Sequence, residues 1–321
     1  MNEPSHPAFS STPDMQISSA NRDAMAPELE QIDRKVGWLI INRFTYKLMR
    51  VLGRLGQPKV DTSGVTITQV DGTGPGTYVV LPDERAGSGA VLLIHGGGLV
   101  IGSTADVRPQ AVNLCRRLGV PVICSGYRLA PESPFPAGLD DCHSAWQWLL
   151  DHAGEMAIDT AKIVIGGYSA GAGLAACLAQ KLRDEGGRQP AAQLLVYPML
   201  DDRTAARREL DKPRHRVWSN RNNLFGWSSY LGHQPGQDSA QYAVAARQDD
   251  LSGLPPAWIG IGTCDLFLDE GRIYAQRLTE AGVATEYVEA KGALHAFDMG
   301  GTEMGKTFVN MQLEFVQKFV S

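Results

Sequence analysis

The residue with the clearest chemical potential in this chain is Ser169, which lies in the pattern G-x-S-x-G. An apolar stretch at 163–166 comes before the motif and predicts a short buried strand, whereas apolar residues at helical spacing from Leu174 to Leu182 follow it. A serine on a tight turn between a strand and a helix projects its hydroxyl above the edge of a sheet, where it can act as a nucleophile. The alternative is a glycine-rich turn with no chemical role, because in a chain with 35 glycines chance alone supplies roughly 0.2 copies of this spacing.

A serine nucleophile needs a base, and His295 is the best candidate among seven histidines. In hydrolases with this motif the chain order is nucleophile, acid, base, so that the histidine comes late. His295 follows the last predicted strand, at 285–289, in a loop that reads Gly-Ala-Leu-His-Ala-Phe. Its alternative role is that of a loop imidazole that caps a helix or faces solvent.

The acid of such a group is expected at the end of a strand between the serine and the histidine. Asp265 comes just after the predicted strand at 257–262, where its carboxylate could accept a hydrogen bond from the imidazole and fix its tautomer. Asp269 and Glu270 are the rivals. Both lie where acidic residues stabilise the first turn of the next predicted helix, which is a sufficient structural reason for them. We therefore favour Asp265.

Acyl transfer also needs N–H groups that stabilise an oxyanion. A predicted buried strand at 90–94 runs directly into His95 and three glycines, so bare backbone amides can point at a substrate oxygen. We expect Gly97 and Gly98, together with Ala170 after the serine, to supply these donors. His95 is expected to brace the loop rather than to transfer a proton.

The elements that must position these residues alternate between buried strands and amphipathic helices from residue 90 onward. Repeated βα units predict an α/β fold with a mostly parallel, doubly wound sheet. Two segments with alternating polarity, at 65–68 and 77–81, predict antiparallel edge strands. Further strands are expected at 121–125 and 193–197, and helices at 107–118, 140–152, 270–281 and from 303 to the C-terminus.

We divide the chain into five parts. Residues 1–26 are rich in Ser, Pro and Asn and are expected to form a mobile arm. Residues 27–60 have helical periodicity and predict one or two amphipathic cap helices. The core is expected to comprise 61–200 and 243–321, interrupted by a polar and aromatic segment at 201–242 that is too long for a loop and predicts a helical cap insertion. The cap would lie over the carboxyl ends of the strands, where open α/β sheets bind ligands.

Composition excludes several classes of function. A net charge of −5 and no local Lys/Arg run argue against nucleic acid or an anionic membrane surface as a partner. The five cysteines include no C-x-x-C pair and are expected to be reduced core thiols. No signal peptide is apparent and no apolar run could span a bilayer, so the sequence predicts a cytoplasmic protein. Histidines and acids do not cluster at metal-ligand spacing, and no glycine loop carries a phosphate-binding lysine, so no metal or cofactor is expected.

Six motifs in order give the chain a resemblance to the hormone-sensitive lipase family of esterases. They are HGGG at 95–98, YRLAPE at 127–132, FPA at 135–137, GYSAG at 167–171, DLFLDE at 265–270 and HAF at 295–297. The resemblance implies an α/β-hydrolase fold with an eight-stranded sheet and a helical cap, a carboxylesterase activity without a cofactor, and often a homodimer formed through the last strand. It assigns the nucleophile to Ser169, the acid to Asp265 and the base to His295.

The chain departs from the family at three positions near these motifs. Tyr168 stands where the family often has aspartate, Leu99 where it has an aromatic residue, and Leu266 where it has proline. Tyr168 and Leu99, with Trp227 of the cap, are expected to border the substrate pocket. The sequence thus predicts an esterase for small acyl esters of short chain length. An amide hydrolase with the same triad and a non-catalytic receptor on the same fold remain as alternatives.

Overall fold

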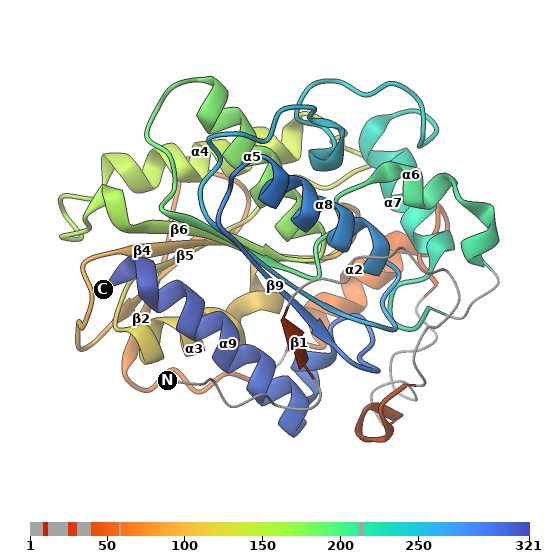
Figure 1. The fold of residues 1–321 in the computed structure, drawn as a ribbon. Coiled ribbons are helices and arrows are strands. Elements are labelled where there is room, and N and C mark those ends of the chain that lie inside the picture. The colour runs from red at the N-terminus through yellow and green to blue at the C-terminus, as the bar shows by residue number, and fades with distance from the viewer. Residues whose placement is uncertain (1–8, 12–24, 31–39, 58, 212–214) are drawn as a thin grey trace.

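A twisted sheet runs through the middle of the molecule, with helices on both faces (Figure 1). The structure is a computed structural model that describes residues 9–11, 25–30, 40–57, 59–211 and 215–321. Within them the strand order is β1-β9-β8-β7-β6-β4-β5-β3-β2. The strands are β1 (Phe9–Ser11), β2 (Val65–Gln69), β3 (Tyr78–Pro82), β4 (Ala90–Ile94), β5 (Val122–Ser125), β6 (Ile163–Tyr168), β7 (Ala192–Val196), β8 (Ala257–Gly262) and β9 (Thr285–Ala290).

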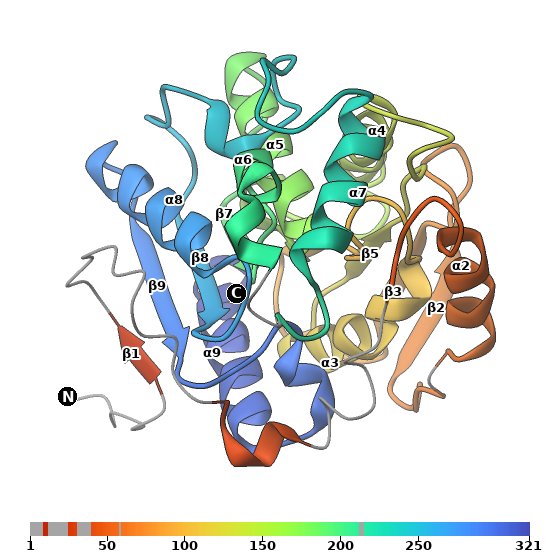
Figure 2. The same ribbon diagram turned by 90° about the vertical axis from the view of Figure 1, so that its right-hand side faces the viewer.

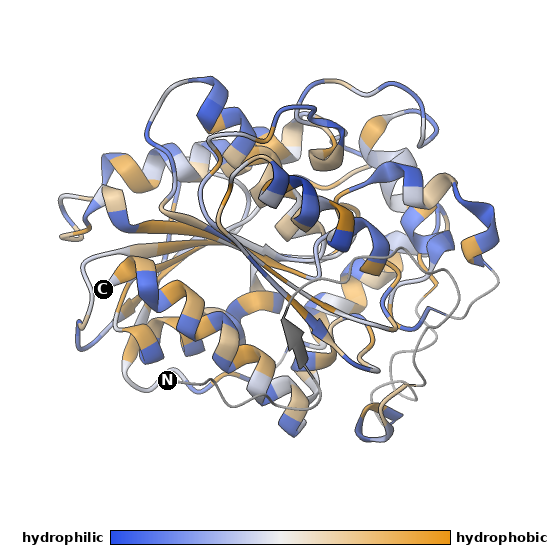
Figure 3. Ribbon diagram, viewed as in Figure 1, coloured by the Kyte–Doolittle hydropathy of each residue, from blue (hydrophilic) through white to orange (hydrophobic). Residues whose placement is uncertain are grey.

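The centre of the sheet is parallel and the edge is antiparallel, as the sequence predicts. β4 pairs in parallel with both β5 and β6, and β6, β7, β8 and β9 continue in parallel. β2 and β3 form the antiparallel edge next to β5. Every residue of β4 and β6 is buried, because helices cover both faces of a parallel sheet. Figure 3 shows these strands as an apolar layer between helices that are polar on their outer side.

Five long helices form the two outer layers. α3 (Arg108–Leu118) and α9 (Glu303–Val320) cover one face of the sheet, and α4 (Ala137–Asp151), α5 (Ala170–Asp184) and α8 (Leu268–Glu280) cover the other (Figure 1). Each buries an apolar stripe and turns polar residues outward. The α/β class and the mostly parallel eight-stranded sheet, β2 to β9, are confirmed.

The insertion after β7 is helical. It contains α6 (Asp202–Ala206), a 3-10 turn η4 (Arg208–Asp211) and α7 (Asn220–Leu231), which begins at a Ser219 side-chain cap and ends at Gly232 in a left-handed conformation. The α7 region packs on the loop after β4: a Cβ added to Gly226 would lie 2.6 Å from the carbonyl oxygen of Gly98. This segment therefore lies at the carboxyl ends of the parallel strands.

The N-terminal part is only partly described, and one segment of it differs from the expectation. Within 27–60 the structure has a 3-10 turn η1 (Pro27–Leu29) and α2 (Tyr46–Leu55), whereas residues 31–39 lie outside the described residues. Within 1–26, which were expected to form a mobile arm, residues 9–11 form β1 and pair antiparallel with β9. No periodicity marks these three residues as a strand, because their pairing depends on a partner almost 280 positions away, Ser11 facing Val288 for example.

Short 3-10 turns complete the chain. They are η2 (Thr104–Val107), η3 (Thr160–Lys162), η5 (Ala245–Arg247) and η6 (Phe297–Gly300). None of the helices in the described residues is both long enough and apolar enough to cross a bilayer.

Candidate active site

Ser169 occupies a sharp turn between β6 and α5. Its backbone has φ 55° and ψ −118°, a conformation that L-residues rarely adopt. The two glycines of the motif have a steric reason: a Cβ on Gly167 would lie 2.5 Å from the carbonyl carbon of Gly171, and one on Gly171 would lie 2.3 Å from the carbonyl oxygen of Ile94. Only glycine at both positions allows the strand and helix to approach so closely, and this approach presents the serine hydroxyl at the end of the sheet.

His295 and Asp265 converge on this serine from two neighbouring strands. Asp265 follows β8 and His295 follows β9, so both come from the carboxyl ends of parallel strands. His295 Nε2 lies 2.9 Å from Ser169 Oγ, and His295 Nδ1 lies 2.7 Å from Asp265 Oδ2. The exposed fractions are 6% for Ser169, 5% for His295 and 1% for Asp265, so the three side chains interact where little water competes.

The Asp265 carboxylate is held at both oxygens. Its Oδ1 accepts the backbone N–H of Phe267 at 2.9 Å, while Oδ2 faces the imidazole. The two rivals lie elsewhere: Asp269 Oδ2 is 3.6 Å from an Arg207 guanidinium nitrogen, and Glu270 accepts the N–H of Leu200 at 2.7 Å. Of the three acids, Asp265 is the one that contacts the histidine.

Glu270 is more than an N-terminal helix residue, which is the role that the sequence suggested. It is buried, and its Oε2 accepts a hydrogen bond from the Thr204 hydroxyl. Burial, with Asp201 nearby, raises the pKa of this carboxyl well above its ordinary value. Its position ties α8 to the segment that follows β7, a contact between distant parts of the chain that sequence periodicity does not reveal.

The glycine loop after β4 lies against the serine. A Cβ on Gly96 would lie 3.4 Å from the Ser169 Cβ, and Gly97 and Gly98 have φ values of 116° and 58°. A Cβ on Gly98 would lie 2.0 Å from the Trp218 ring. Ala170 begins α5, so its N–H is one of the helix's first amides, which have no partner within the helix. The three amides that the sequence singles out thus belong to two segments that meet at the serine.

His95 supports this loop from beneath. Its Nδ1 donates to the Gly96 carbonyl at 2.8 Å, and its ring stacks on Tyr127 with centroids 4.2 Å apart. The Tyr127 hydroxyl donates to the His95 carbonyl at 3.2 Å. Burial lowers the pKa of His95 to about 4, so the imidazole is neutral near pH 7.

A small cavity lies beside Ala170. Its volume is about 10 Å³, and Leu99 and Trp227, two residues that the sequence places in the pocket, line it. The lining also includes Met199, Leu174 and Tyr230. These three were not predicted, because Met199 and Leu174 read as ordinary core residues and the approach of Tyr230 depends on how α7 folds back.

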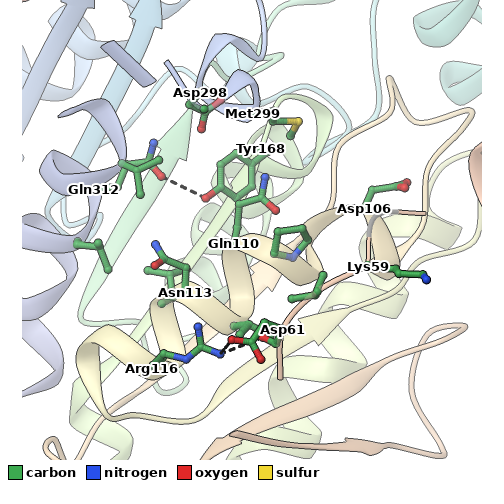
Figure 4. A pocket seen from close by; sticks show the side chains of 17 residues that line it. Lys59, Asp61, Asp106, Gln110, Asn113, Arg116, Tyr168, Asp298, Met299 and Gln312 are labelled. Atoms are coloured by element: carbon green, nitrogen blue, oxygen red, sulfur yellow. Dashed lines mark hydrogen bonds and ion pairs between the residues drawn. The ribbon is translucent and has the colours of Figure 1, made fainter. Parts of the chain in front are cut away.

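Tyr168, the third expected pocket residue, faces a different hollow. Because side chains alternate along β6, it points toward α3 and α9, away from α5. Figure 4 shows it among the side chains that line a groove of about 580 Å³. Its hydroxyl donates to Gln312 Oε1 at 3.1 Å. Leu99 and Trp227 therefore share one cavity, and Tyr168 belongs to another.

Asp298, at the edge of the same groove, is linked to the histidine through Tyr197. The Tyr197 hydroxyl donates to Asp298 Oδ1 at 3.0 Å, and its ring meets the His295 ring edge-on with centroids 4.8 Å apart. Burial raises the pKa of Asp298 to about 6. In the sequence, Asp298 is only an acidic residue three positions after His295, so this link was not predicted.

The described residues contain no group of three His, Cys, Asp or Glu side chains placed to share a metal ion. Their five cysteines are free thiols, four of them buried.

The sequence matches a family described as the alpha/beta hydrolase fold over residues 91–299. Among curated proteins it is 34% identical over 224 residues to carboxylesterase NlhH of Mycobacterium tuberculosis, covering 67% of this chain and 68% of that protein. It is 31% identical over 251 residues to an ethyl acetate hydrolase of Pseudomonas putida, covering 77% and 78% respectively. Among solved structures, a bacterial heroin esterase superposes with a TM-score of 0.86 at 32% identity, over 93% of this chain and 98% of that one.

Proposed function

Because this chain belongs to the alpha/beta hydrolase family, with hormone-sensitive-lipase-like carboxylesterases as its relatives, it is a carboxylic ester hydrolase, and we propose that it cleaves short-chain acyl esters through an acyl-enzyme on Ser169. In this proposal His295 is the general base and Asp265 the orienting acid. The observation that carries it is the continuous contact from Asp265 Oδ2 through both nitrogens of His295 to Ser169 Oγ, at 2.7 and 2.9 Å.

The contacts of His295 support the tautomer that the mechanism needs. Asp265 is an acceptor, so His295 carries its proton on Nδ1 and leaves Nε2 free to accept the Ser169 proton. As Ser169 Oγ attacks the ester carbonyl carbon, His295 Nε2 takes up this proton and becomes an imidazolium. The nearby Asp265 carboxylate stabilises that cation. The carbonyl oxygen becomes an oxyanion, and the amides of Gly97, Gly98 and Ala170 donate to it.

Collapse of the tetrahedral intermediate expels the alcohol, which leaves with the proton from His295 Nε2. A water molecule then attacks the acyl-enzyme while His295 again acts as the base, and the acid is released as Ser169 regains its proton. The Asp265 Oδ1 bond to the Phe267 amide keeps the carboxylate oriented throughout both steps.

The small cavity beside Ala170 supports a limit on the acyl chain. A volume of about 10 Å³ is close to the smallest space that holds one water molecule. Leu99, Met199 and Trp227 close it with large side chains. A longer acyl chain on this side of Ser169 must therefore displace one of these side chains, and each further carbon adds to that displacement. Two curated relatives, the ethyl acetate hydrolase of Pseudomonas putida and an acetyl-hydrolase of Streptomyces hygroscopicus, have names that agree with a small acyl group.

The test is a series of p-nitrophenyl esters from acetate to palmitate. We expect kcat/KM to peak between about two and four carbons and to fall beyond, because a methylene adds about 0.8 kcal/mol of binding only where it can be buried. A Trp227→Ala variant should move the peak toward longer chains, and an Ile273→Ala variant, which changes an exposed side chain on α8, should not. A maximum at twelve carbons or more would contradict the short-chain proposal.

A further inference from the structure

α2 presents an apolar face to solvent. Phe44, just before the helix, and Leu48, Val51, Leu52 and Leu55 within it have exposed fractions of 77%, 56%, 51%, 49% and 79%. Their spacing of three or four residues places them in one stripe along the helix. Of the eight large apolar side chains that are exposed in the described residues, these five and Ile40 account for six. Scattered apolar residues are common on protein surfaces, but such a contiguous stripe marks a contact site.

The opposite face of α2 fixes the helix to the body of the protein. Tyr46 is buried, and its hydroxyl donates to Glu132 Oε1 at 3.0 Å. Arg50 donates to the Val100 and Ala130 carbonyls, each at 2.8 Å, and its guanidinium pairs with Glu132 at 3.0 Å. These contacts hold the helix against rolling, so the stripe stays on the outside. Figure 2 shows α2 at the right-hand margin of the molecule.

The residues around the stripe are basic. From 40 to 60 the chain has five Lys or Arg residues and no Asp or Glu. Arg50 is engaged with Glu132, whereas Arg43, Lys47 and Arg54 are exposed. Lys47 and Arg54 are seven residues apart and therefore lie along the same edge of the apolar stripe. The net charge of −5 over the whole chain obscures this local excess, and the expectation of no membrane partner rested on that net charge and on the lack of a Lys/Arg run.

We propose that α2 docks on an anionic phospholipid surface. Phe44, Leu48 and Leu55 would enter the boundary between headgroups and acyl chains, and Lys47 and Arg54 would lie near the phosphates. An apolar face bordered by Lys and Arg is the pattern of helices that lie in this interface. A second copy of this chain is a poorer occupant, because a two-fold contact through α2 would bring two basic edges together with no acidic residue on either helix to pair with them.

The test uses the full chain and sedimented vesicles. One vesicle preparation is phosphatidylcholine alone, and the other is phosphatidylcholine and phosphatidylglycerol in equal parts. The wild type should sediment with the mixed vesicles, and high salt should weaken this binding because the charge attraction is screened. Wild-type protein that stays in the supernatant with mixed vesicles at low salt would overturn the proposal.

Two double variants separate the apolar and the charged contributions. Leu48→Gln with Leu55→Gln should lower the partition coefficient about tenfold or more, since Gln preserves helix propensity but removes buried carbons. Lys47→Gln with Arg54→Gln should lower binding to mixed vesicles about tenfold or more and leave binding to phosphatidylcholine unchanged. Matched controls are Ile273→Gln and Arg188→Gln, which change exposed residues away from α2.

The same variants identify the other possible occupants. If the wild type is a dimer by light scattering, binds no vesicles, and becomes monomeric with Leu48→Gln and Leu55→Gln, a second copy covers the stripe. If that double variant instead lowers the melting temperature in buffer and the wild type binds no vesicles, another part of this chain covers it. Either result overturns the lipid proposal. All variants should keep the wild-type rate on a soluble ester, so the outcome does not depend on the proposed catalytic roles.

Discussion

At the level of single residues, the proposed mechanism depends on which acid orients the histidine. Asp265 contacts His295 at 2.7 Å, whereas Asp269 lies near Arg207 at the start of α8. Asp265→Asn should lower kcat by roughly 10³- to 10⁴-fold, because the amide no longer fixes the productive tautomer. Asp269→Asn should leave kcat near wild type and cost under about 1 kcal/mol of stability. Initial rates and thermal melts of both variants check this, and the reverse ranking would move the acid to Asp269.

Asp298 provides a prediction about stability and pH. Its folded pKa is raised to about 6 from an ordinary 3.8, so the folded protein binds this proton more tightly than the unfolded chain. The stabilisation is present below about pH 4 and is lost as the pH rises through about 6. Asn cannot ionise, so Asp298→Asn does not lose this stabilisation as the pH rises. The melting temperature of Asp298→Asn minus that of the wild type should therefore increase between about pH 4 and 7.

Asp250→Asn is the matched control for this experiment. Asp250 is fully exposed, and hydrogen bonds from Ser252 lower its pKa, so its contribution changes only below about pH 4. The difference in melting temperature between Asp250→Asn and the wild type should therefore stay constant between about pH 4 and 7. A flat difference for Asp298→Asn as well would show that this carboxyl does not titrate near pH 6 in the folded protein.

The candidate site was largely predictable residue by residue where the signal is local in sequence. G-x-S-x-G, the glycine run after β4 and the acid and histidine after β8 and β9 are each marked by a strand that ends at them. The contact of the Tyr197 ring with His295 and that of the Trp218 ring with Gly98 were not predictable. Both depend on which side chain fills the space beside the site residue. Such contacts are set by packing between distant elements and not by any spacing along the chain.

At the scale of elements, the loop between β4 and α3 must approach α7 without a side chain at Gly98. A Cβ there would collide with the Trp218 ring, and φ of 58° is unfavourable for other residues. Gly98→Ala should displace this loop and reduce kcat/KM by about 10²-fold or more, since the oxyanion donors shift. Gly187→Ala, where an added Cβ meets nothing within 4 Å, should have no effect on the rate. Wild-type activity in Gly98→Ala would show that the loop position does not matter for the oxyanion.

Elements with strong periodicity appear within a few residues of where the sequence predicts them. β8 spans the expected residues, and α9 begins at the expected Glu303. In contrast, the three-residue β1 has no pattern of its own, and the outward face of α2 reads in the sequence like an ordinary core-facing stripe. A helix's apolar periodicity gives its amphipathic face but not the partner that the face contacts.

At the scale of the whole molecule, β1 occupies the outer side of β9 at three positions, Val288 to Ala290. A homodimer through the last strand, which the sequence resemblance predicts, would need that same edge. A chain that begins at Met25 lacks β1 and exposes the β9 edge, so it should form more dimer than the full chain, because unpaired strand edges associate. Light scattering of both chains checks this, and an unchanged ratio of monomer to dimer would argue against dimerisation through β9.

We propose that Ser169 is the nucleophile of a serine esterase. The test is kcat/KM of Ser169→Ala on p-nitrophenyl acetate, with circular dichroism as the control for folding. We expect a wild-type spectrum and a rate reduced by about 10³-fold or more, because the acyl-enzyme cannot form without the hydroxyl. A folded variant that keeps more than about a tenth of the wild-type kcat/KM would have lost less than about 1.4 kcal/mol of transition-state stabilisation, and that result would contradict the claim.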